Sequence, residues 1–514
     1  MSLFLEIPDL QLEIKPENAR WEVRGWDDLS PSLKDVPVCL HYRKGRANQR
    51  ILDSWPGASV SVAETKATPV GFLRQAEIRI GKEGDDLFCT LCFALSDVGS
   101  TLLWRLEIEN CAPEPVYVDR IELLSAGFPD PLRPGSPGAI EFPARDRRSE
   151  RDFAFFSNGW QSWSYSGAYS ARDRFRSTRL GPLTVNKDYN PGTPRPNRVG
   201  AFASDMFGVL GERRLRSAVL AGFLSQREHF GSIESQLRQE AAALRLWANG
   251  DGVRLDPGRK MVTDWACLQF LNLDDPDPQG PYFDLVARSH SLESPASLPA
   301  PPVGWCSWYY FSSSDYTGDL REEDIRQNLE SLRALRPELP AELVQIDDGF
   351  ESQVGDWFSF SAGFPNGVKP LADEIRAAGF TPGLWLAPFI VHPRSCLASE
   401  HPDWLLRGEN RRPVNAGYLW GTFTTALDLT HPGALDYASD VVHTAVSEWG
   451  FPYLKLDFLY AGALAGQHFD PTKTRAQILR MGLEAVRRAA GEETVLLGCG
   501  CPLGSAIGLV DAMR

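Results

Sequence analysis

The sequence predicts two units of different fold class, an antiparallel β domain followed by an α/β barrel. Two observations separate them. The N-terminal part consists of short strand patterns divided by turns, whereas the C-terminal part alternates apolar runs with helical patterns. With 514 residues, the chain is also too long for one ordinary hydrophobic core. We therefore assign residues 1–290 to a β-sandwich domain, 291–302 to a linker and 303–514 to a barrel.

The strand patterns of the first domain alternate apolar and polar residues. Residues 104–109 read Trp-Arg-Leu-Glu-Ile-Glu, which is typical of a half-buried strand. Similar segments bounded by Gly, Pro, Asn or Asp lie at 87–95, 116–124, 217–224, 243–248 and 262–271. Several such strands without intervening helices predict a large antiparallel sandwich. A helical pattern at 281–290 is expected to close the domain.

The linker and the barrel follow from a change of pattern. Residues 291–302 contain Pro295, Pro299, Pro301 and Pro302, which is typical of a linker. Apolar runs that end in polar or small residues then occur at 303–309, 343–347, 383–388, 453–458, 495–499 and 509–513. Helical spacing lies between them, as in Ile325, Leu329 and Leu332, in Val368, Leu371 and Ile375, and over 472–489. This alternation predicts a parallel sheet or a (β/α) barrel.

The barrel is expected to be incomplete in this chain. A closed barrel of this type needs eight strands in about 250 residues. The sequence offers six strand candidates, and the last of them, 509–513, stands directly before Arg514. We therefore expect an open sheet of about six strands with exposed edges.

Composition excludes several classes of partner. The net charge is -14 and no long basic run occurs, which argues against nucleic acid or anionic membrane as partner. No apolar run approaches 18 residues, and the first 18 residues carry acids throughout, so a cytoplasmic protein is expected. The nine cysteines lack a framework spacing and the eight histidines lack a ligand cluster. We expect no metal and no cofactor.

One stretch of the barrel carries the strongest chemical signal. Residues 453–457 read Tyr-Leu-Lys-Leu-Asp, so Lys455 and Asp457 stand two apart on one strand and face the same side. A carboxylate beside an ammonium has a lowered pKa and can serve as a nucleophile. The alternative is a structural ion pair, but the carboxyl end of a barrel strand favours catalysis.

Two adjacent acids follow the second barrel strand. Asp347 and Asp348 stand in the sequence Gln-Ile-Asp-Asp-Gly, and both can face one ligand only where the strand gives way to a loop, which Gly349 permits. Paired acids accept hydrogen bonds from neighbouring hydroxyls, such as two hydroxyls of one sugar. The alternative is a solvated turn.

The aromatic and cysteine motifs fit two interpretations each. Trp305 lies in Gly-Trp-Cys-Ser-Trp and Trp385 in Gly-Leu-Trp-Leu-Ala-Pro, and either ring fits core packing or a pocket wall. Cys499 lies in a glycine-rich stretch that would let a ligand approach the backbone, but a buried thiol fits equally well. The aromatic loop at 158–164 of the β domain favours packing over a role in the site.

Taken in order, these motifs resemble the family 36 glycoside hydrolases, the melibiase-type α-galactosidases. The matching segments are GWCSW at 304, IDDGF at 346, GDW at 355, FPNGVKPLADEI at 364, GLWLAP at 383, HPDW at 401, LDLTHP at 427 and YLKLDF at 453. The resemblance covers 303–514, and in the β domain it rests on the general layout and on NGWQSW at 158.

The resemblance implies a β-supersandwich followed by a (β/α)8 barrel, and retaining hydrolysis of terminal α-galactosyl groups from small α-galactosides. It implies Asp457 as the nucleophile, with Asp347 and Asp348 holding the galactose 4- and 6-hydroxyls. It also implies Lys455 beside the nucleophile, Trp305 and Trp385 as pocket aromatics, Cys499 near the 2-position of the sugar, and Arg514 just before the general acid/base. Homo-oligomers are expected only by analogy.

The general acid/base is expected after Arg514, since Asp511 stands before the arginine and does not fit the role. On this interpretation the chain carries one half of a catalytic pair and binds sugar weakly at best. Three functions stay open: an α-galactosidase or α-N-acetylgalactosaminidase, a galactosyl transferase of the raffinose-synthase type, and an inactive sugar-binding remnant.

Overall fold

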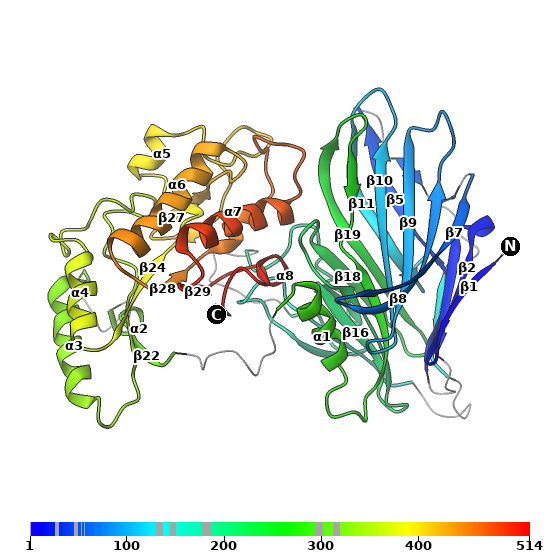
Figure 1. The fold of residues 1–514 in the computed structure, drawn as a ribbon, viewed down its shortest axis with the longest axis horizontal. Coiled ribbons are helices and arrows are strands. Elements are labelled where there is room, and N and C mark those ends of the chain that lie inside the picture. Colours follow the sequence, from blue (N-terminus) through cyan, green and yellow to red (C-terminus); the bar gives the residue numbers. More distant parts are fainter. Residues whose placement is uncertain are drawn as a thin grey trace.

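The structure is a computed structural model that separates a β-rich body from a mixed α/β body (Figure 1). It describes residues 2–25, 30–45, 50–52, 54–55, 57–129, 137–143, 151–176, 187–292, 302–311 and 319–514. Most of the predicted linker, 291–302, lies outside the described residues. Among the described helices, none combines the length and the apolar character needed to cross a bilayer.

The first body contains three antiparallel sheets, as predicted. The ten-stranded sheet runs β14 (Gly167–Ser170), β13 (Phe153–Ser157), β16 (Phe207–Glu212), β17 (Ser217–Phe223), β21 (Ala266–Asn272), β10 (Thr101–Asn110), β9 (Leu87–Ser96), β8 (Gly71–Ile80) and β7 (Ser59–Thr68), with β20 (Lys260–Val262) beside β10. The six-stranded sheet runs β15 (Ala201–Asp205), β18 (Gly231–Leu237), β19 (Ala242–Leu255), β11 (Val116–Ala126), β5 (Cys39–Lys44) and β6 (Arg50–Leu52). The third sheet runs β1 (Leu3–Ile7), β2 (Leu10–Lys15), β3 (Arg20–Gly25), β4 (Ser32–Pro37) and β12 (Ala139–Glu141).

The sheets enclose one apolar core, which the alternating pattern explains. Trp21 of β3 and Trp104 of β10 come from different sheets, and their ring centroids lie 5.3 Å apart. Trp104 also donates from Nε1 to the carbonyl of Leu123 in β11, at 3.0 Å. Helix α1 (Gly280–Ser289) occupies the position predicted for a helix, and its Tyr282 hydroxyl donates to Phe223 O at 2.9 Å.

The second body is built on a six-stranded, fully parallel sheet, in agreement with the predicted incomplete barrel. Its order is β22 (Gly304–Cys306), β23 (Leu343–Ile346), β24 (Thr381–Leu386), β28 (Tyr453–Leu456), β29 (Val495–Gly498) and β30 (Ala512–Met513). Each strand falls within or overlaps one predicted apolar run. Strand β22 is shorter than the run predicted at 303–309, because the chain turns at Ser307 into the short helix α2 (Trp308–Phe311).

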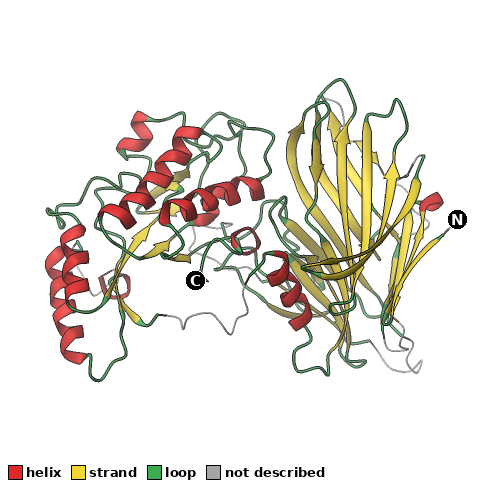
Figure 2. Cartoon of the chain, viewed as in Figure 1, coloured by secondary structure: helices red, strands yellow, loops and turns green. Residues whose placement is uncertain are grey.

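Helices alternate with these strands and flank the sheet (Figure 2). The helices are α3 (Glu322–Leu335), α4 (Lys369–Ala377), α5 (Cys396–Glu400), α6 (Pro432–His443), α7 (Arg475–Ala490) and α8 (Leu503–Ala506). Ile325 and Leu329 of α3 are buried, as their spacing predicts. Between β24 and β28, the chain adds the antiparallel strands β25 (Ile390–Val391), β26 (Gly417–Leu419) and β27 (Thr422–Ala426).

The two bodies are joined by backbone pairing between segments far apart in the sequence. The loop after β13 runs antiparallel to the loop after β29, through a bridge between Gln161 and Pro502. Ser162 N donates to Cys501 O at 3.1 Å, and Leu503 N donates to Trp160 O at 3.0 Å. A loop of the sandwich thus extends the carboxyl edge of the barrel sheet.

A buried arginine forms a second junction. Arg475, the first residue of α7, pairs with Asp251 of β19 through Nη2 and Oδ1 at 2.8 Å. The same Nη2 donates to Asn190 Oδ1 at 2.9 Å. Both charged side chains are at least nine-tenths buried. The guanidinium therefore satisfies acceptors of the sandwich that have little access to water.

Replacing this arginine should weaken the junction strongly. The substitution Arg475→Met leaves the buried Asp251 carboxylate without its countercharge and removes one donor from Asn190, at a cost of about 3–5 kcal/mol. We expect the first unfolding transition in urea to move to lower concentration. The control Lys369→Met removes an exposed ion pair with Asp373 and should leave that transition in place. Equal shifts for the two variants would contradict the role of Arg475.

Candidate active site

The carboxyl ends of the parallel strands open into a cavity of about 620 Å³. Its lining residues are Trp163, Trp308, Asp347, Asp348, Trp385, Leu419, Trp420, Lys455, Asp457, Phe458, Cys499 and Arg514. Aromatic walls with a few convergent charged groups are typical of a small-molecule site, and this end of a barrel sheet is where such sites form.

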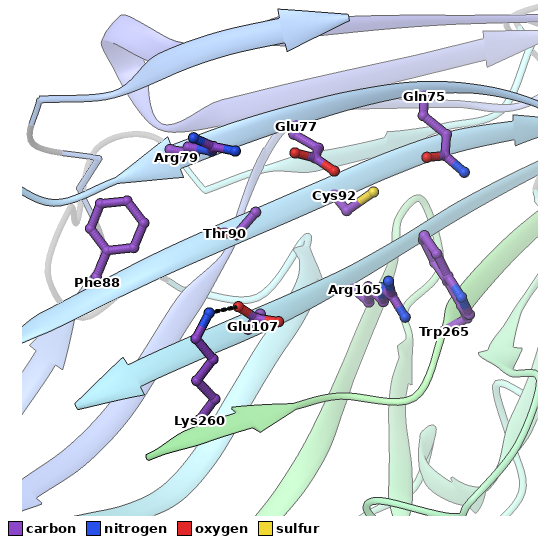
Figure 3. Close-up of a pocket in the computed structure, with 10 residues that line it drawn as sticks. All are labelled: Gln75, Glu77, Arg79, Phe88, Thr90, Cys92, Arg105, Glu107, Lys260 and Trp265. Carbon is purple, nitrogen blue, oxygen red and sulfur yellow. Dashed lines mark hydrogen bonds and ion pairs between the residues drawn. The ribbon is translucent and has the colours of Figure 1, made fainter. Parts of the chain in front are cut away.

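A second hollow lies on the outer face of the ten-stranded sheet (Figure 3). Its charged groups are largely matched with each other: Lys260 pairs with Glu107 at 2.8 Å, and the Arg105 guanidinium lies 4.5 Å from the centre of the Trp265 ring. None of its lining side chains has a buried polar atom that lacks a partner. This hollow is therefore a solvated face of the sheet, and we place the candidate site in the barrel.

Lys455 lies between two carboxylates at the bottom of the cavity. Its Nζ is 2.9 Å from Asp347 Oδ2 and 3.7 Å from Asp457 Oδ2. All three residues are buried. Burial opposes the charged ammonium, but Asp347 and then Asp457 outweigh it, so the pKa of Lys455 is raised and the side chain stays protonated. The predicted neighbour Asp457 is therefore the second partner of Lys455, and Asp347 is the closer one.

The Asp457 carboxylate is fixed at both oxygens. Trp385 Nε1 donates to Oδ2 at 3.0 Å, and the backbone N–H of Phe458 donates to Oδ1 at 2.9 Å. Phe458 has φ 54°, in the left-handed region, so the strand ends there and the chain turns into a 3-10 helix at Leu459–Ala463. This turn brings the amide of Phe458 back onto the carboxylate that precedes it.

Asp347 combines one saturated oxygen with one unsatisfied oxygen. Oδ2 accepts hydrogen bonds from Lys455 Nζ, from Gln345 Nε2 at 2.5 Å and from Cys306 Sγ at 3.4 Å. Oδ1 is buried and finds no donor among the described residues. A buried acceptor without a partner is costly, so this oxygen is suited to a donor brought by a ligand.

Asp348 is held by the hairpin formed by β26 and β27. Trp420, at the tip of this hairpin, donates from Nε1 to Asp348 Oδ2 at 2.6 Å. Trp420 and Gly421 have φ values of 50° and 73°, which make the tight turn. Burial raises the pKa of Asp348, and the negative charges of Asp347 and Asp457 add to this effect. Trp420 was not predicted, because nothing in its local sequence connects it to Asp348.

One wall of the cavity comes from the sandwich domain. Trp163 packs edge to face against Phe458 at 5.4 Å and lines the cavity. A Cβ on Gly500 would lie 2.9 Å from the Trp163 ring, so this position must be glycine, and its φ of 54° agrees. Packing was favoured for the 158–164 loop: Trp160 lies in the barrel core, and Trp163 packs against that core and also lines the cavity.

The remaining predicted residues divide between the cavity and its surroundings. Cys499 and Arg514 line the cavity, but Trp305 does not, contrary to expectation. Trp305 neighbours Cys306, whose thiol faces Asp347, so strand alternation turns the indole to the opposite side, where it meets Phe311. Trp308 lines the cavity in its place.

Over the part of the chain that the structure describes, no group of three His, Cys, Asp or Glu side chains is arranged to hold a metal ion.

Comparison with known proteins identifies relatives of the barrel. Residues 326–478 match the Melibiase family model. The α-galactosidase AgaA of Geobacillus stearothermophilus is 32% identical over 146 residues, which cover 27% of this chain and 19% of the relative. An α-galactosidase of Escherichia coli is 28% identical over 232 residues, covering 43% of this chain and 30% of the relative. The matched segments thus span less than a third of these relatives.

Solved structures extend the similarity to the sandwich. The α-galactosidase TtGalA of Thermus thermophilus, in complex with p-nitrophenyl α-D-galactopyranoside, has a TM-score of 0.56 and 28% identity, covering 85% of this chain and 74% of that one. An α-galactosidase from Lactobacillus brevis has a TM-score of 0.65 over 100% of this chain and 72% of that one. Its identity is 14%, so it supports the fold alone.

The cavity thiols should resist alkylation. Burial raises the pKa of Cys499 to about 12, and the negative charge of Asp457 contributes to the rise. Burial and the negative charge of Asp347 raise the pKa of Cys306 to about 12 in the same way. At pH 8 both are protonated thiols, which are poor nucleophiles. Iodoacetamide at pH 8 should label the exposed Cys111 and Cys396 first, as read by peptide mass mapping. Labelling of Cys499 at the rate of Cys111 would contradict this.

Proposed function

We propose that this chain, which belongs to the melibiase family, binds a terminal α-galactosyl group in the barrel cavity and attacks its anomeric carbon with Asp457. The reaction would be that of a retaining α-galactosidase acting on small α-galactosides. The observation that carries the proposal is Asp457 itself, a buried carboxylate held at both oxygens in an aromatic cavity, with a lysine ammonium at 3.7 Å.

The two other aspartates are suited to hold the sugar. Asp347 Oδ1 is a buried acceptor that a sugar hydroxyl would satisfy, and Asp348 stands next to it, fixed by Trp420. Hydrogen bonds to charged acceptors contribute more than neutral ones, about 1.5–3 kcal/mol each. The rings of Trp385 and Trp420 supply apolar surface for the C–H faces of the sugar. Cys499 and Arg514 complete the proposed binding residues.

Asp457 would act by nucleophilic substitution at C1. One of its carboxylate oxygens forms a bond to the anomeric carbon while the glycosidic C–O bond breaks, giving a galactosyl ester that water then hydrolyses. The Lys455 ammonium offsets the negative charges of Asp457 and of the adjacent Asp347. The leaving oxygen takes its proton from a second carboxyl about 5–5.5 Å from the first. We assign the role of this acid to none of the described residues.

Two further proposals concern organisation and location. We propose 1–290 and 303–514 as the two domains, which is supported by separate apolar clusters centred on the sandwich and on the barrel. We propose the cytoplasm as the compartment, which is supported by nine cysteines that are all free thiols.

Asp457 can be tested independently of the acid. With 5-fluoro-α-D-galactosyl fluoride, the Asp457 oxygen bonds to C1 and fluoride leaves without needing a proton. The expected product is a chain heavier by one fluorogalactosyl group, with the label located on Asp457 by peptide mass spectrometry. The variant Asp457→Asn should stay unlabelled, because the amide is a poor nucleophile.

The matched control is Asp403→Asn, which changes an exposed aspartate and should label like the wild type. A label on another residue, or equal labelling of Asp457→Asn, would refute the assignment of the nucleophile.

The role of Asp347 can be tested by sugar binding. The substitution Asp347→Asn removes the charged acceptor and should raise the Kd for D-galactose by about 10- to 150-fold, the equivalent of 1.5–3 kcal/mol. Isothermal titration calorimetry at pH 7 measures this change. The exposed Asp373→Asn serves as control and should bind galactose with unchanged affinity. An unchanged Kd for Asp347→Asn would remove this residue from the site.

A further inference from the structure

Glu351 is a buried acid behind the candidate site that the proposed function does not use. Its side chain is 6% exposed, and it lies three residues after Asp348. The backbone N–H of Gly349 donates to Glu351 Oε2 at 3.3 Å, and a bridge between Glu351 and Phe360 holds its backbone in place. Over the described residues, Glu351 forms no ion pair with a lysine, arginine or histidine, although a buried carboxylate would need one.

Asp348 and Glu351 both line a hollow beside the cavity, and their carboxyl groups are within reach of each other for one hydrogen bond. Two ionised carboxylates have only acceptors, so a hydrogen bond between them requires one proton. Asp348 accepts from Trp420 Nε1 at 2.6 Å, whereas Glu351 accepts from Gly349 N at 3.3 Å, so the negative charge is better stabilised on Asp348. Glu351 is therefore the donor, with one oxygen accepting from Gly349 and the other carrying the proton.

The charges around the pair agree with this distribution. Burial raises the pKa of Glu351 well above its ordinary value, and the charge of Asp348 raises it further. Burial is also the largest cause that raises the pKa of Asp348, and the negative charges of Asp347 and Asp457 raise it further. The hydrogen bonds from Glu351 and Trp420 act in the opposite direction and lower this pKa. Lys455, on the neighbouring strand β28, is bonded to Asp347.

We propose that Glu351 is a positioning residue that stays protonated and donates its O–H to Asp348, fixing the Asp348 carboxylate between Trp420 and the sugar. This inference rests on the proposed function, in which Asp348 accepts from a sugar hydroxyl. With a donor on each side, Asp348 has a single orientation and keeps lone pairs free for the ligand. Loss of the shared proton at high pH would replace the hydrogen bond with repulsion between two buried charges.

Calorimetric titration with D-galactose from pH 5 to pH 9.5 tests this role. We expect wild-type affinity to fall at the alkaline end, as Glu351 loses its proton. The variant Glu351→Gln keeps both contacts, since its amide oxygen accepts from Gly349 and its NH2 donates to Asp348 without titrating. It should bind like the wild type at pH 7 and lose the alkaline fall. The variant Glu351→Ala should bind about tenfold more weakly at pH 7.

The matched control is Glu322→Gln, which changes a second buried glutamate, at the start of α3 and bonded to Asn366 and Arg326. It should retain the wild-type pH profile. Infrared spectroscopy provides a readout without sugar: the protonated carboxyl band at pH 7 should be weaker in Glu351→Gln than in the wild type by one carboxyl. The band that remains includes Asp205, because burial raises the pKa of that residue to about 7.

The outcomes separate this inference from the proposed function. If galactose binds and depends on Asp347, but Glu351→Gln keeps the full alkaline fall or an infrared band as strong as that of the wild type, the role of Glu351 is wrong and the proposed function stands. If Glu351→Ala is folded, as judged by circular dichroism, and binds like the wild type, the role is also wrong. If the wild type binds no galactose at any pH, the proposed function fails and this inference fails with it.

Discussion

The cavity depends on one buried ammonium group. Asp347 and Asp457 stand at the ends of two parallel strands, where two buried carboxylates come close together. Lys455 lies between them, at 2.9 Å from the first and 3.7 Å from the second, and its positive charge offsets their repulsion. Its position follows from the sheet, because β28 lies inside it, between β24 and β29.

The indole groups complement this ion triad without adding charge. Trp385 donates to Asp457 and Trp420 donates to Asp348, so each of these carboxylates receives one indole N–H. The two rings meet edge to face at 6.3 Å and form a continuous apolar wall. An aromatic wall excludes water, and the electrostatic interactions of the carboxylates are stronger for it. The same side chains thus orient the acids and shape the space for a ligand.

Much of this arrangement could be predicted from periodicity. Apolar and polar residues that alternate with period two indicate half-buried strands, and apolar runs that alternate with helical patterns indicate a parallel sheet. Both fold classes and all six parallel strands were therefore predicted. The shared face of Lys455 and Asp457 followed from the same rule. The closer pairing of Lys455 with Asp347 could not, because it depends on the register of β23, β24 and β28. Trp305 was predicted to line the cavity but does not, because its position along the strand, and not its residue type, decides which face of the sheet the indole lies on.

Trp163 shows a different limit of sequence analysis, since its position is set by contacts between segments more than 300 residues apart. Backbone pairing of Gln161 with Pro502 carries this ring to the barrel, and Gly500 leaves room for it. Arg475 of the barrel in turn satisfies Asp251 of the sandwich. Each domain therefore supplies a group that the other lacks: the sandwich closes a wall of the cavity, and the barrel satisfies a buried charge of the sandwich. The cavity therefore lies at the interface between the two domains, and its geometry depends on how the domains pack against each other.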